Sequence, residues 1–282
     1  MSKIIAIVAL VLAAWVPGAP ATAEELQGSW TMSSSKEAGK VHFGIFHRRE
    51  GNNINSENDW AVTAFQGLDL ATRARHDVKF VIARDAGRFD CEGYLENGAG
   101  AGPFRFTPSA QYAQSMAAIG FTGVEENLQF AMAIHDVSLD YARQMKAEKL
   151  ADLDTDKLLA FRIFDVTPQF IREIRAAGLT ANDADKLIAF RVHGVTPAFA
   201  GELRRAGIEA DEDKLIAFRI HGVTPEYVAK VEALGYGRPS ADQLIAMRIH
   251  GVTPEFIAQM KSRGLKDLSI DKLVALRVHG ID

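Results

Sequence analysis

The sequence has one cysteine, Cys91, among 282 residues. A single thiol cannot form an internal disulfide, so the fold must depend on its apolar core. Cys91 alternates with Phe89 in a segment that has the two-residue period of a strand. This alternation predicts a buried and unreactive thiol.

The sequence also has little excess of negative over positive charge, since the formal net charge is −4. The sequence has no basic stripe of the kind that nucleic acid requires. It also lacks the catalytic motifs HExxH and GxSxG. The glycines Gly98, Gly100 and Gly102 do not form a phosphate-binding loop, because the Lys-Ser/Thr pair of such a loop does not follow them. These absences favour a non-enzymatic protein, and we predict no catalytic residue, cofactor or metal.

No apolar run reaches the length of a membrane span. The run at residues 4–16 has 13 residues, whereas a helical span takes about 20. Lys3 precedes this run, and Ala21-Thr22-Ala23 matches the small-x-small rule for signal peptidase. We therefore predict a signal peptide over 1–23 and export to the periplasm or the medium, with no stable membrane anchor after cleavage.

Residues 24–106 have the two-residue period of strands and predict a small antiparallel β-meander domain of four or five strands. The polar stretch 51–58 predicts a loop, and 60–75 is ambiguous. A tight turn is expected at 85–87, with Gly87 at positive φ, and a looser turn at 97–102. The predicted strands are 28–35, 40–47, 78–84, 88–95 and 103–107.

Residues 107–282 consist of repeats. The segment DKLIAFRVHGVTP at 185–197 recurs as DKLIAFRIHGVTP at 213–225, and other copies follow the same step of 28 or 29 residues. A constant step of this size is typical of stacked repeats, in which no unit buries its apolar face alone. The other copies begin at residues 127, 156, 242 and 271.

Each repeat is predicted to be a pair of helices. In one copy, Ser240 is a good N-cap for the first helix and Gly251 follows its last residue. Thr253 and Pro254 begin the second helix, and Gly264 ends it. The first helix has little polar surface, so we expect it to lie inside. The second helices are predicted at 168–177, 197–206, 225–234 and 254–263.

The predicted fold class is therefore α+β, with a small antiparallel β-meander domain followed by a solenoid-like array of two-helix repeats. The array begins with half a repeat near Thr107, directly after the last strand. Because no linker separates the two parts, we expect sheet and helices to pack together.

A histidine recurs at the end of the first helix, with Phe164 in its place in one copy. Equivalent positions in stacked helices lie about 8–10 Å apart, too far for two imidazoles to share one zinc ion. We expect these rings to bond helix-end carbonyls instead. They are His135, His193, His221, His250 and His279.

An arginine recurs among apolar residues of the first helix. A buried guanidinium must be paired, either with the recurring aspartates of another repeat or with helix-end carbonyls. We predict a structural ladder that fixes the stacking, and an anion-binding groove is the alternative. The arginines are Arg162, Arg191, Arg219, Arg248 and Arg277, and the aspartates are Asp156, Asp185, Asp213, Asp242 and Asp271.

The segment RDAGRFDCEGYLENGAGAGPFRFTP (84–108), together with the HGVTPEFI-type repeats, resembles a group of uncharacterised bacterial secreted proteins. The same elements are similar to the region after the peptidase domain in some membrane metallopeptidases of the beta-lactam-sensor type. The resemblance covers about residues 26–282. It implies an extracytoplasmic sensing or interaction module and no peptidase activity, because HExxH and membrane helices are missing here.

Our first hypothesis is a non-enzymatic exported module that presents a helical-repeat surface to a protein or peptide of the cell envelope. A binding protein for a small ligand or glycan is one alternative, which exposed aromatics such as Trp30 and Trp60 would favour. A hydrolase with a site between sheet and helices is the other, and a cleft with two close carboxylates would favour it.

Overall fold

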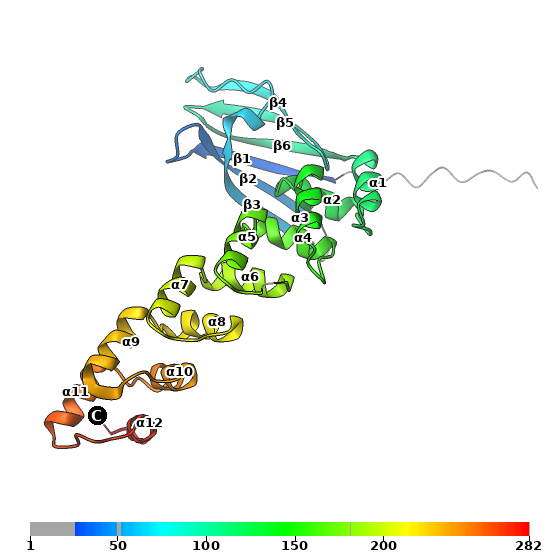
Figure 1. Cartoon of the computed structure of the whole chain (residues 1–282). Helices are drawn as coiled ribbons and strands as arrows, with labels where there is room; N and C mark the ends of the chain where they lie inside the picture. The colour runs from blue at the N-terminus through cyan, green and yellow to red at the C-terminus, as the bar shows by residue number, and fades with distance from the viewer. Residues whose placement is uncertain (1–25, 50–51, 181, 282) are drawn as a thin grey trace, which may run out of the picture.

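The computed structural model describes residues 26–49, 52–180 and 182–281, so the predicted signal peptide lies outside the described residues. These residues form an α+β structure in which an antiparallel sheet is followed by an array of α-helices (Figure 1). The sheet has six strands, more than predicted. They are β1 (Leu26–Ser34), β2 (Lys40–Arg49), β3 (Asn52–Ala61), β4 (His76–Arg84), β5 (Gly87–Glu96) and β6 (Ala99–Pro108).

Two three-stranded meanders meet along β1 and β6, in the order β3-β2-β1-β6-β5-β4. The sheet curves around its apolar face. The rings of Phe43 on β2 and Phe80 on β4 lie 6.2 Å apart, although β1, β6 and β5 separate these strands. The connection from β3 to β4 includes a short 3-10 helix, η1 (Val62–Ala64), and crosses this face (Figure 1). It places Phe65 against both rings, which closes one end of the core.

Trp30 explains one glycine of β6, Gly102. Its Nε1 donates a hydrogen bond of 3.0 Å to the carbonyl oxygen of Glu92 on β5, across the intervening strand β6. Gly102 is the β6 residue opposite Trp30, and a Cβ there would lie 1.9 Å from the Glu92 oxygen. The indole therefore reaches β5 only because β6 has no side chain at this position.

Three predictions about the sheet are wrong. Residues 52–58 belong to strand β3 rather than to a loop. The looser turn is a two-residue turn at Asn97 and Gly98, both at positive φ, and β6 begins directly after it. Gly87 does not have positive φ. Glycine is required there by close packing, since a Cβ would lie 2.4 Å from the Phe106 ring.

The repeats are helix pairs, as predicted. The described residues contain twelve α-helices. The first helices of the pairs are α2 (Glu126–Ile134), α4 (Thr155–Ile163), α6 (Ala184–His193), α8 (Glu212–His221), α10 (Ala241–Ile249) and α12 (Ile270–Val278). The second helices are α1 (Ala110–Ala118), α3 (Leu139–Ala147), α5 (Pro168–Ala176), α7 (Pro197–Arg205), α9 (Pro225–Val231), which continues into the π-helical turn η2 (Glu232–Tyr236), and α11 (Pro254–Ser262).

The sequence places four of the second helices correctly because each of the four begins with a threonine cap followed by proline. The hydroxyl of Thr196 accepts a hydrogen bond from the backbone of Phe199, and Pro197 occupies the first turn. The other copies that begin with Thr-Pro are capped in the same way. All four second helices predicted from the sequence are confirmed.

Sheet and array pack together, as expected. Helix α2 lies against β5 and β6, and its Phe130 ring is within 5.9 Å of the rings of Phe89, Phe104 and Phe106. The turn between β4 and β5 holds the next helix, because Asp85 accepts a hydrogen bond of 2.8 Å from the backbone N–H of Leu139. Figure 1 shows the remaining repeats extending away from the sheet. In the part of the chain that the structure describes, no helix has the length and apolar character needed to cross a membrane.

Candidate functional site

The first helices expose an apolar stripe. The residue after each recurring arginine is aliphatic and between 48% and 58% exposed. One turn earlier in each helix lies a half-buried aliphatic residue, on the same face because the two are four residues apart. The apolar stripe is made of Ile163, Val192, Ile220, Ile249 and Val278, with Leu159, Ile188, Ile216, Ile245 and Val274 beside them.

The prediction that the first helices lie inside is therefore wrong. In α8, Leu215 and Phe218 are buried, whereas Ile220 on the opposite side of the helix is more than half exposed. The second helices and the neighbouring first helices cover only part of each first helix. An apolar composition did not reveal that one face of the helix has no neighbour among the described residues.

The first copy differs, because its two equivalent residues are buried. Phe130 stands at the position of Leu159, and Ile134 at the position of Ile163. Both lie on α2, which packs on the sheet, and their exposed fractions are 0% and 4%. The molecule therefore already covers the first unit of this helix face with an apolar protein surface.

Four of the five recurring arginines contact the preceding repeat in two ways. The Nε of Arg248 donates to the carbonyl oxygen of His221 at 3.0 Å, and its guanidinium lies over the Tyr227 ring, 4.9 Å from the centroid. This is the helix-end pairing, one of the two that the sequence leaves open. Equivalent hydrogen bonds are made by Arg162, Arg191 and Arg219, and equivalent ring contacts by Arg162, Arg191, Arg219 and Arg277.

These arginines are not buried as expected. The side chains of Arg162 and Arg191 are 30% and 28% exposed, and Arg219 belongs to the exposed residues. Each lies at the edge of its helix, between two repeats, so its stem is covered and part of its head group reaches solvent.

One or two residues after the end of each first helix lies an aspartate or a glycine with positive φ. Asp136 and Asp165 have this conformation in the early copies, and Gly194 and Gly222 in the later ones. The aspartates form ion pairs with the arginine of the next repeat, Arg162 at 3.7 Å in the first case and Arg191 in the second. The glycines supply no carboxylate at that place.

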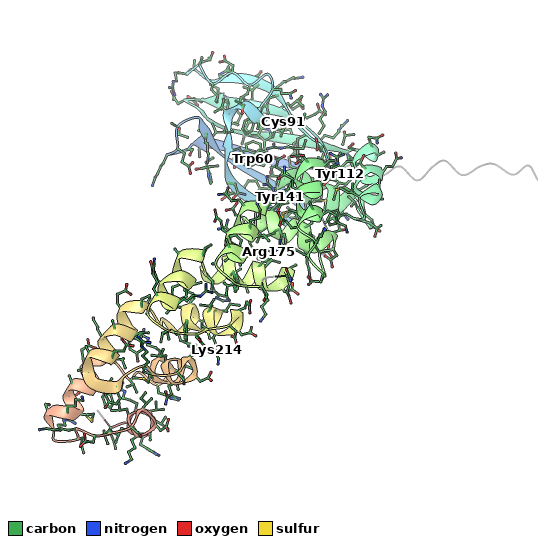
Figure 2. All side chains as sticks on the ribbon, in the orientation of Figure 1. Trp60, Cys91, Tyr112, Tyr141, Arg175 and Lys214 are labelled. Carbon is green, nitrogen blue, oxygen red and sulfur yellow. The ribbon has the colours of Figure 1, made fainter. Side chains whose placement is uncertain are left out.

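The recurring aspartates do not pair with the arginines. Three of the five bind the lysine of the preceding repeat instead, in the pairs Lys157–Asp185 at 3.0 Å, Lys186–Asp213 and Lys214–Asp242 at 3.3 Å. Lys214 lies between α8 and α10 (Figure 2). Because an aspartate near the start of the helix is far from the arginine near its end, only the lysine can reach it. These exposed pairs border the apolar stripe on the side of the helix N-termini.

The histidines contribute through their backbone rather than their rings. The carbonyl oxygens of His135, His193 and His221 accept the arginine bonds. Among the described residues, none of the five recurring rings makes a hydrogen bond to a helix end, contrary to expectation. Burial, and then the charge of Arg162, lower the pKa of His135, so its ring is kept neutral.

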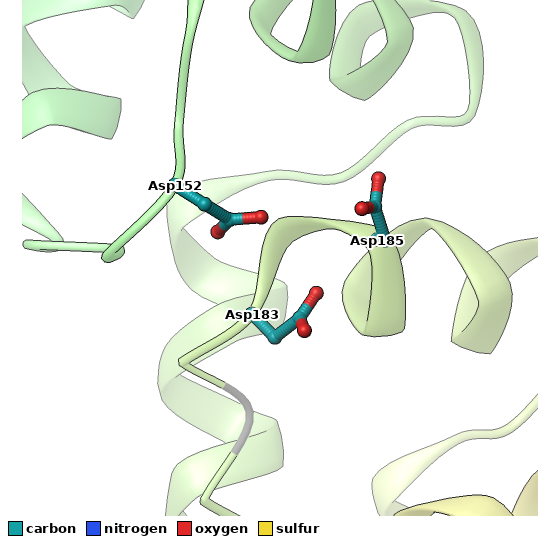
Figure 3. Close-up of side chains that lie close together, drawn as sticks. All are labelled: Asp152, Asp183 and Asp185. Atoms are coloured by element: carbon teal, nitrogen blue, oxygen red, sulfur yellow. The ribbon is translucent and has the colours of Figure 1, made fainter.

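Three carboxylates come close together at Asp152, Asp183 and Asp185 (Figure 3). Each already has a structural role. Asp152 and Asp185 both bind the Lys157 ammonium, Asp152 also accepts from the backbone N–H of Ala184 at 3.0 Å, and Asp183 caps helix α6. The lysine supplies the positive charge that this cluster needs, which explains the arrangement without a metal ion.

A second row of cations was missed by the sequence analysis. The Nη2 of Arg175 donates to the carbonyl oxygen of Glu148 at the end of α3, at 2.9 Å, and its Nη1 donates to the Glu148 carboxylate at 2.8 Å. Lys261 binds the carbonyl oxygen of Leu234 in the same manner. Both helix layers therefore end on a cation from the next repeat, which suits the negative end of a helix dipole. The sequence signal that could have revealed this row is the recurrence of a cation every 29 residues, at Lys146, Arg175 and Arg204.

The sheet does not present the features named for the alternative functions. Trp30 and Trp60 are buried, so they offer no stacking surface to a sugar ring. A hollow of about 620 Å³ lies over β4, β5 and β6, and its carboxylates are paired with cations. The pairs are Arg88–Asp90, with Nε at 2.9 Å, and Lys79–Glu92 at 3.6 Å.

Cys91 also borders this hollow, but its side chain is buried, as predicted. Burial, and then the charge of Asp90, raise the pKa of the Cys91 thiol far above its usual range. Because the thiolate is the reactive form, the Cys91 sulfur is a poor nucleophile.

No family model matches the chain, and comparisons with curated proteins and with solved structures find no match either. The resemblance to bacterial secreted proteins therefore stays a prediction.

Proposed function

We propose that this chain is a non-enzymatic, exported module of the cell envelope that holds a protein or peptide partner on its apolar stripe. The observation that supports this most is the contrast between the first copy and the later ones. Ile134 is covered by the sheet, whereas the five equivalent residues, from Ile163 to Val278, are about half exposed. The later copies thus repeat a surface that the chain itself uses for packing.

The energetics favour an occupant. Complete burial of an aliphatic side chain stabilises by about 1.5–3 kcal/mol relative to full exposure, so covering the remaining surface of five such residues contributes several kcal/mol. Soluble monomers rarely expose contiguous apolar surface without a binding role. Scattered single residues need no explanation, but a row at a constant repeat position does.

Site-specific photo-crosslinking in envelope extract tests the proposal. A photoreactive amino acid at Ile220 should give a defined crosslinked product, and the same amino acid at Ala229, exposed on α9 outside the stripe, should not. Ile249→Lys in the same molecule should remove the Ile220 product while the melting temperature stays unchanged. Equal products from both positions, or none from Ile220, would reject the stripe as a binding surface.

A further inference from the structure

We propose that Arg219 and Arg248 form two carboxylate-binding subsites along the apolar stripe. The occupant would be an extended peptide that carries Asp or Glu at every third residue, with apolar residues between them. This inference rests on the proposed function of the stripe and adds the chemistry of the partner.

The early repeats show that a carboxylate fits at this place. Asp165, two residues after the end of α4, binds the Nη2 of Arg191 through its carboxylate, while the Nε of Arg191 bonds the Asp165 carbonyl oxygen. In the preceding repeat, the Nε of Arg162 bonds the carbonyl oxygen of His135, and its Nη2 forms a longer ion pair of 3.7 Å with the Asp136 carboxylate, which also pairs with Arg84. The guanidinium of Arg191 therefore makes two separate contacts. Its Nε bonds a carbonyl oxygen at the helix end, and its Nη2 bonds a carboxylate.

In later repeats glycine replaces the aspartate, so this position supplies no carboxylate to the arginine Nη2. A Cβ at Gly194 would lie 2.9 Å from the Nη2 of Arg219, and one at Gly222 would lie 2.8 Å from the Nη2 of Arg248. Each guanidinium thus lies against the place that a side chain at the glycine would take, and this flexible end of the arginine must shift slightly to admit one. Within the described residues, Arg219 and Arg248 bond a carbonyl and lie over a ring, but neither forms an ion pair.

The position of these two arginines connects them with the stripe. Ile220 and Ile249 follow them directly and are more than half exposed. A hydrogen bond to a charged group contributes more than a neutral one, but an exposed ion pair by itself contributes little. Neither is enough for a stable complex, so a partner must use the carboxylate contacts and the apolar surface together.

The repeat spacing favours an extended chain. Neighbouring packed helices lie about 8–10 Å apart, and three residues of an extended or polyproline-type chain span about 9–10 Å. One acidic residue in every three would therefore place a carboxylate at each of the two arginines. The residues between them would lie over Val192, Ile220 and Ile249.

A displayed library of random peptides, selected on the wild-type protein, tests this proposal. Two double variants discriminate: Gly194→Asp with Gly222→Asp supplies internal carboxylates as Asp165 does, and Gly194→Asn with Gly222→Asn is its neutral isostere. Asn and Asp both tolerate positive φ, so the two variants carry the same backbone strain. Selected peptides are then synthesised, and their binding is measured by fluorescence anisotropy at low and high salt.

We expect the selected peptides to carry Asp or Glu at three-residue spacing. They should bind the Asn variant like wild type and the Asp variant about tenfold or more weakly, with binding weakened by salt. Arg219→Gln with Arg248→Gln should reproduce the loss, which keeps the test decisive if the Asp variant folds poorly. Peptides without carboxylates, equal binding to the Asp and Asn variants, or no stripe-dependent peptide would each overturn the proposal.

Two outcomes separate this inference from the proposed function. If crosslinking at Ile220 succeeds but the selected peptides are neutral, the stripe binds a partner and only the carboxylate chemistry is wrong. If sedimentation shows a wild-type dimer that Ile220→Lys dissociates, the occupant is a second copy of this chain, and the peptide proposal fails.

Discussion

The Nε of Arg248 lies 3.0 Å from the carbonyl oxygen of His221, and the same guanidinium covers the ring of Tyr227. His221 ends α8, Tyr227 begins α9, and Arg248 belongs to α10. One side chain therefore ties together both helices of one repeat and the first helix of the next. The hydrogen bond also gives a donor to a helix-end carbonyl that would otherwise lack one.

Removing this contact should destabilise the array. For Arg248→Ala we expect a loss of about 1.5–3 kcal/mol in the free energy of unfolding, because a charged hydrogen bond and a cation–π contact disappear. Arg248→Lys should recover only part of the loss, since lysine lacks the planar group that stacks on Tyr227. Urea unfolding measures both. Arg205→Ala, at an exposed position of α7, is the control, and an equal loss there would contradict the account.

A tyrosine placed at Phe170 should stabilise the protein. Tyr112, Tyr141 and Tyr227 each donate from the hydroxyl to the carbonyl of a valine 25 residues later, at 2.7–2.8 Å. Val195 is the residue in that relation to Phe170, and it is buried. Phe170→Tyr should therefore raise the free energy of unfolding by about 0.5–1.5 kcal/mol.

Phe256→Tyr is the matched control for this change. Its corresponding carbonyl belongs to Ile281, which is exposed and can bond water instead. We expect a smaller gain there in the same thermal or urea unfolding experiment. A loss of stability in Phe170→Tyr would show that the hydroxyl is not accommodated.

Alkaline pH should weaken the array through its buried tyrosines. Burial raises the pKa of Tyr227 to about 12, and the nearby Arg248 charge opposes the shift only partly. In the unfolded chain a tyrosine titrates near pH 10. Above about pH 10 the unfolded state loses this proton while the folded state keeps it, so the free energy of unfolding falls as pH rises towards 12. Tyr227→Phe should show a shallower fall over pH 10–12 than wild type, and identical slopes would contradict the prediction.

Two glycines should respond to alanine in opposite ways. Gly102→Ala forces a Cβ to within 1.9 Å of the Glu92 carbonyl oxygen, so β5 and β6 must separate, at a cost of about 3 kcal/mol or more. Gly201→Ala meets nothing within 4 Å and removes a flexible residue from α7, which should stabilise by about 0.5–1 kcal/mol. Thermal melts followed by tryptophan fluorescence and circular dichroism distinguish the two. A stable Gly102→Ala protein would refute the close approach.

The helix pairs could be predicted because their ends are chemically explicit. A threonine and a proline at the start of four second helices, capping residues such as Asp and Ser at other starts, and a residue with positive φ after each end are local signals that do not depend on the rest of the fold. Strand β3 gave no such signal. It is an edge strand, bonded only to β2, and its polar residues lack the apolar alternation by which buried strands are recognised.

The apolar stripe could not be predicted for a different reason. The sequence shows that Ile220 is apolar, but whether it is covered depends on which elements lie above the helix. In the first copy the sheet covers Ile134, and in the later copies no described element covers the equivalent residue. The ion pairs could not be assigned from the sequence for a similar reason. The sequence suggests aspartates as partners of the arginines, and only the geometry shows that lysines pair with the aspartates.

The bonds between repeats all join neighbours. Arg248 reaches back to His221, Tyr227 forward to Val252, and Lys214 forward to Asp242. A load applied to the α12 end therefore passes through every junction in turn, as through springs connected in series. The weakest junction releases one repeat, which lengthens the molecule and lowers the tension while the other repeats stay folded. The sheet carries the same tension as the array, so a repeat junction that opens first limits the tension on the sheet.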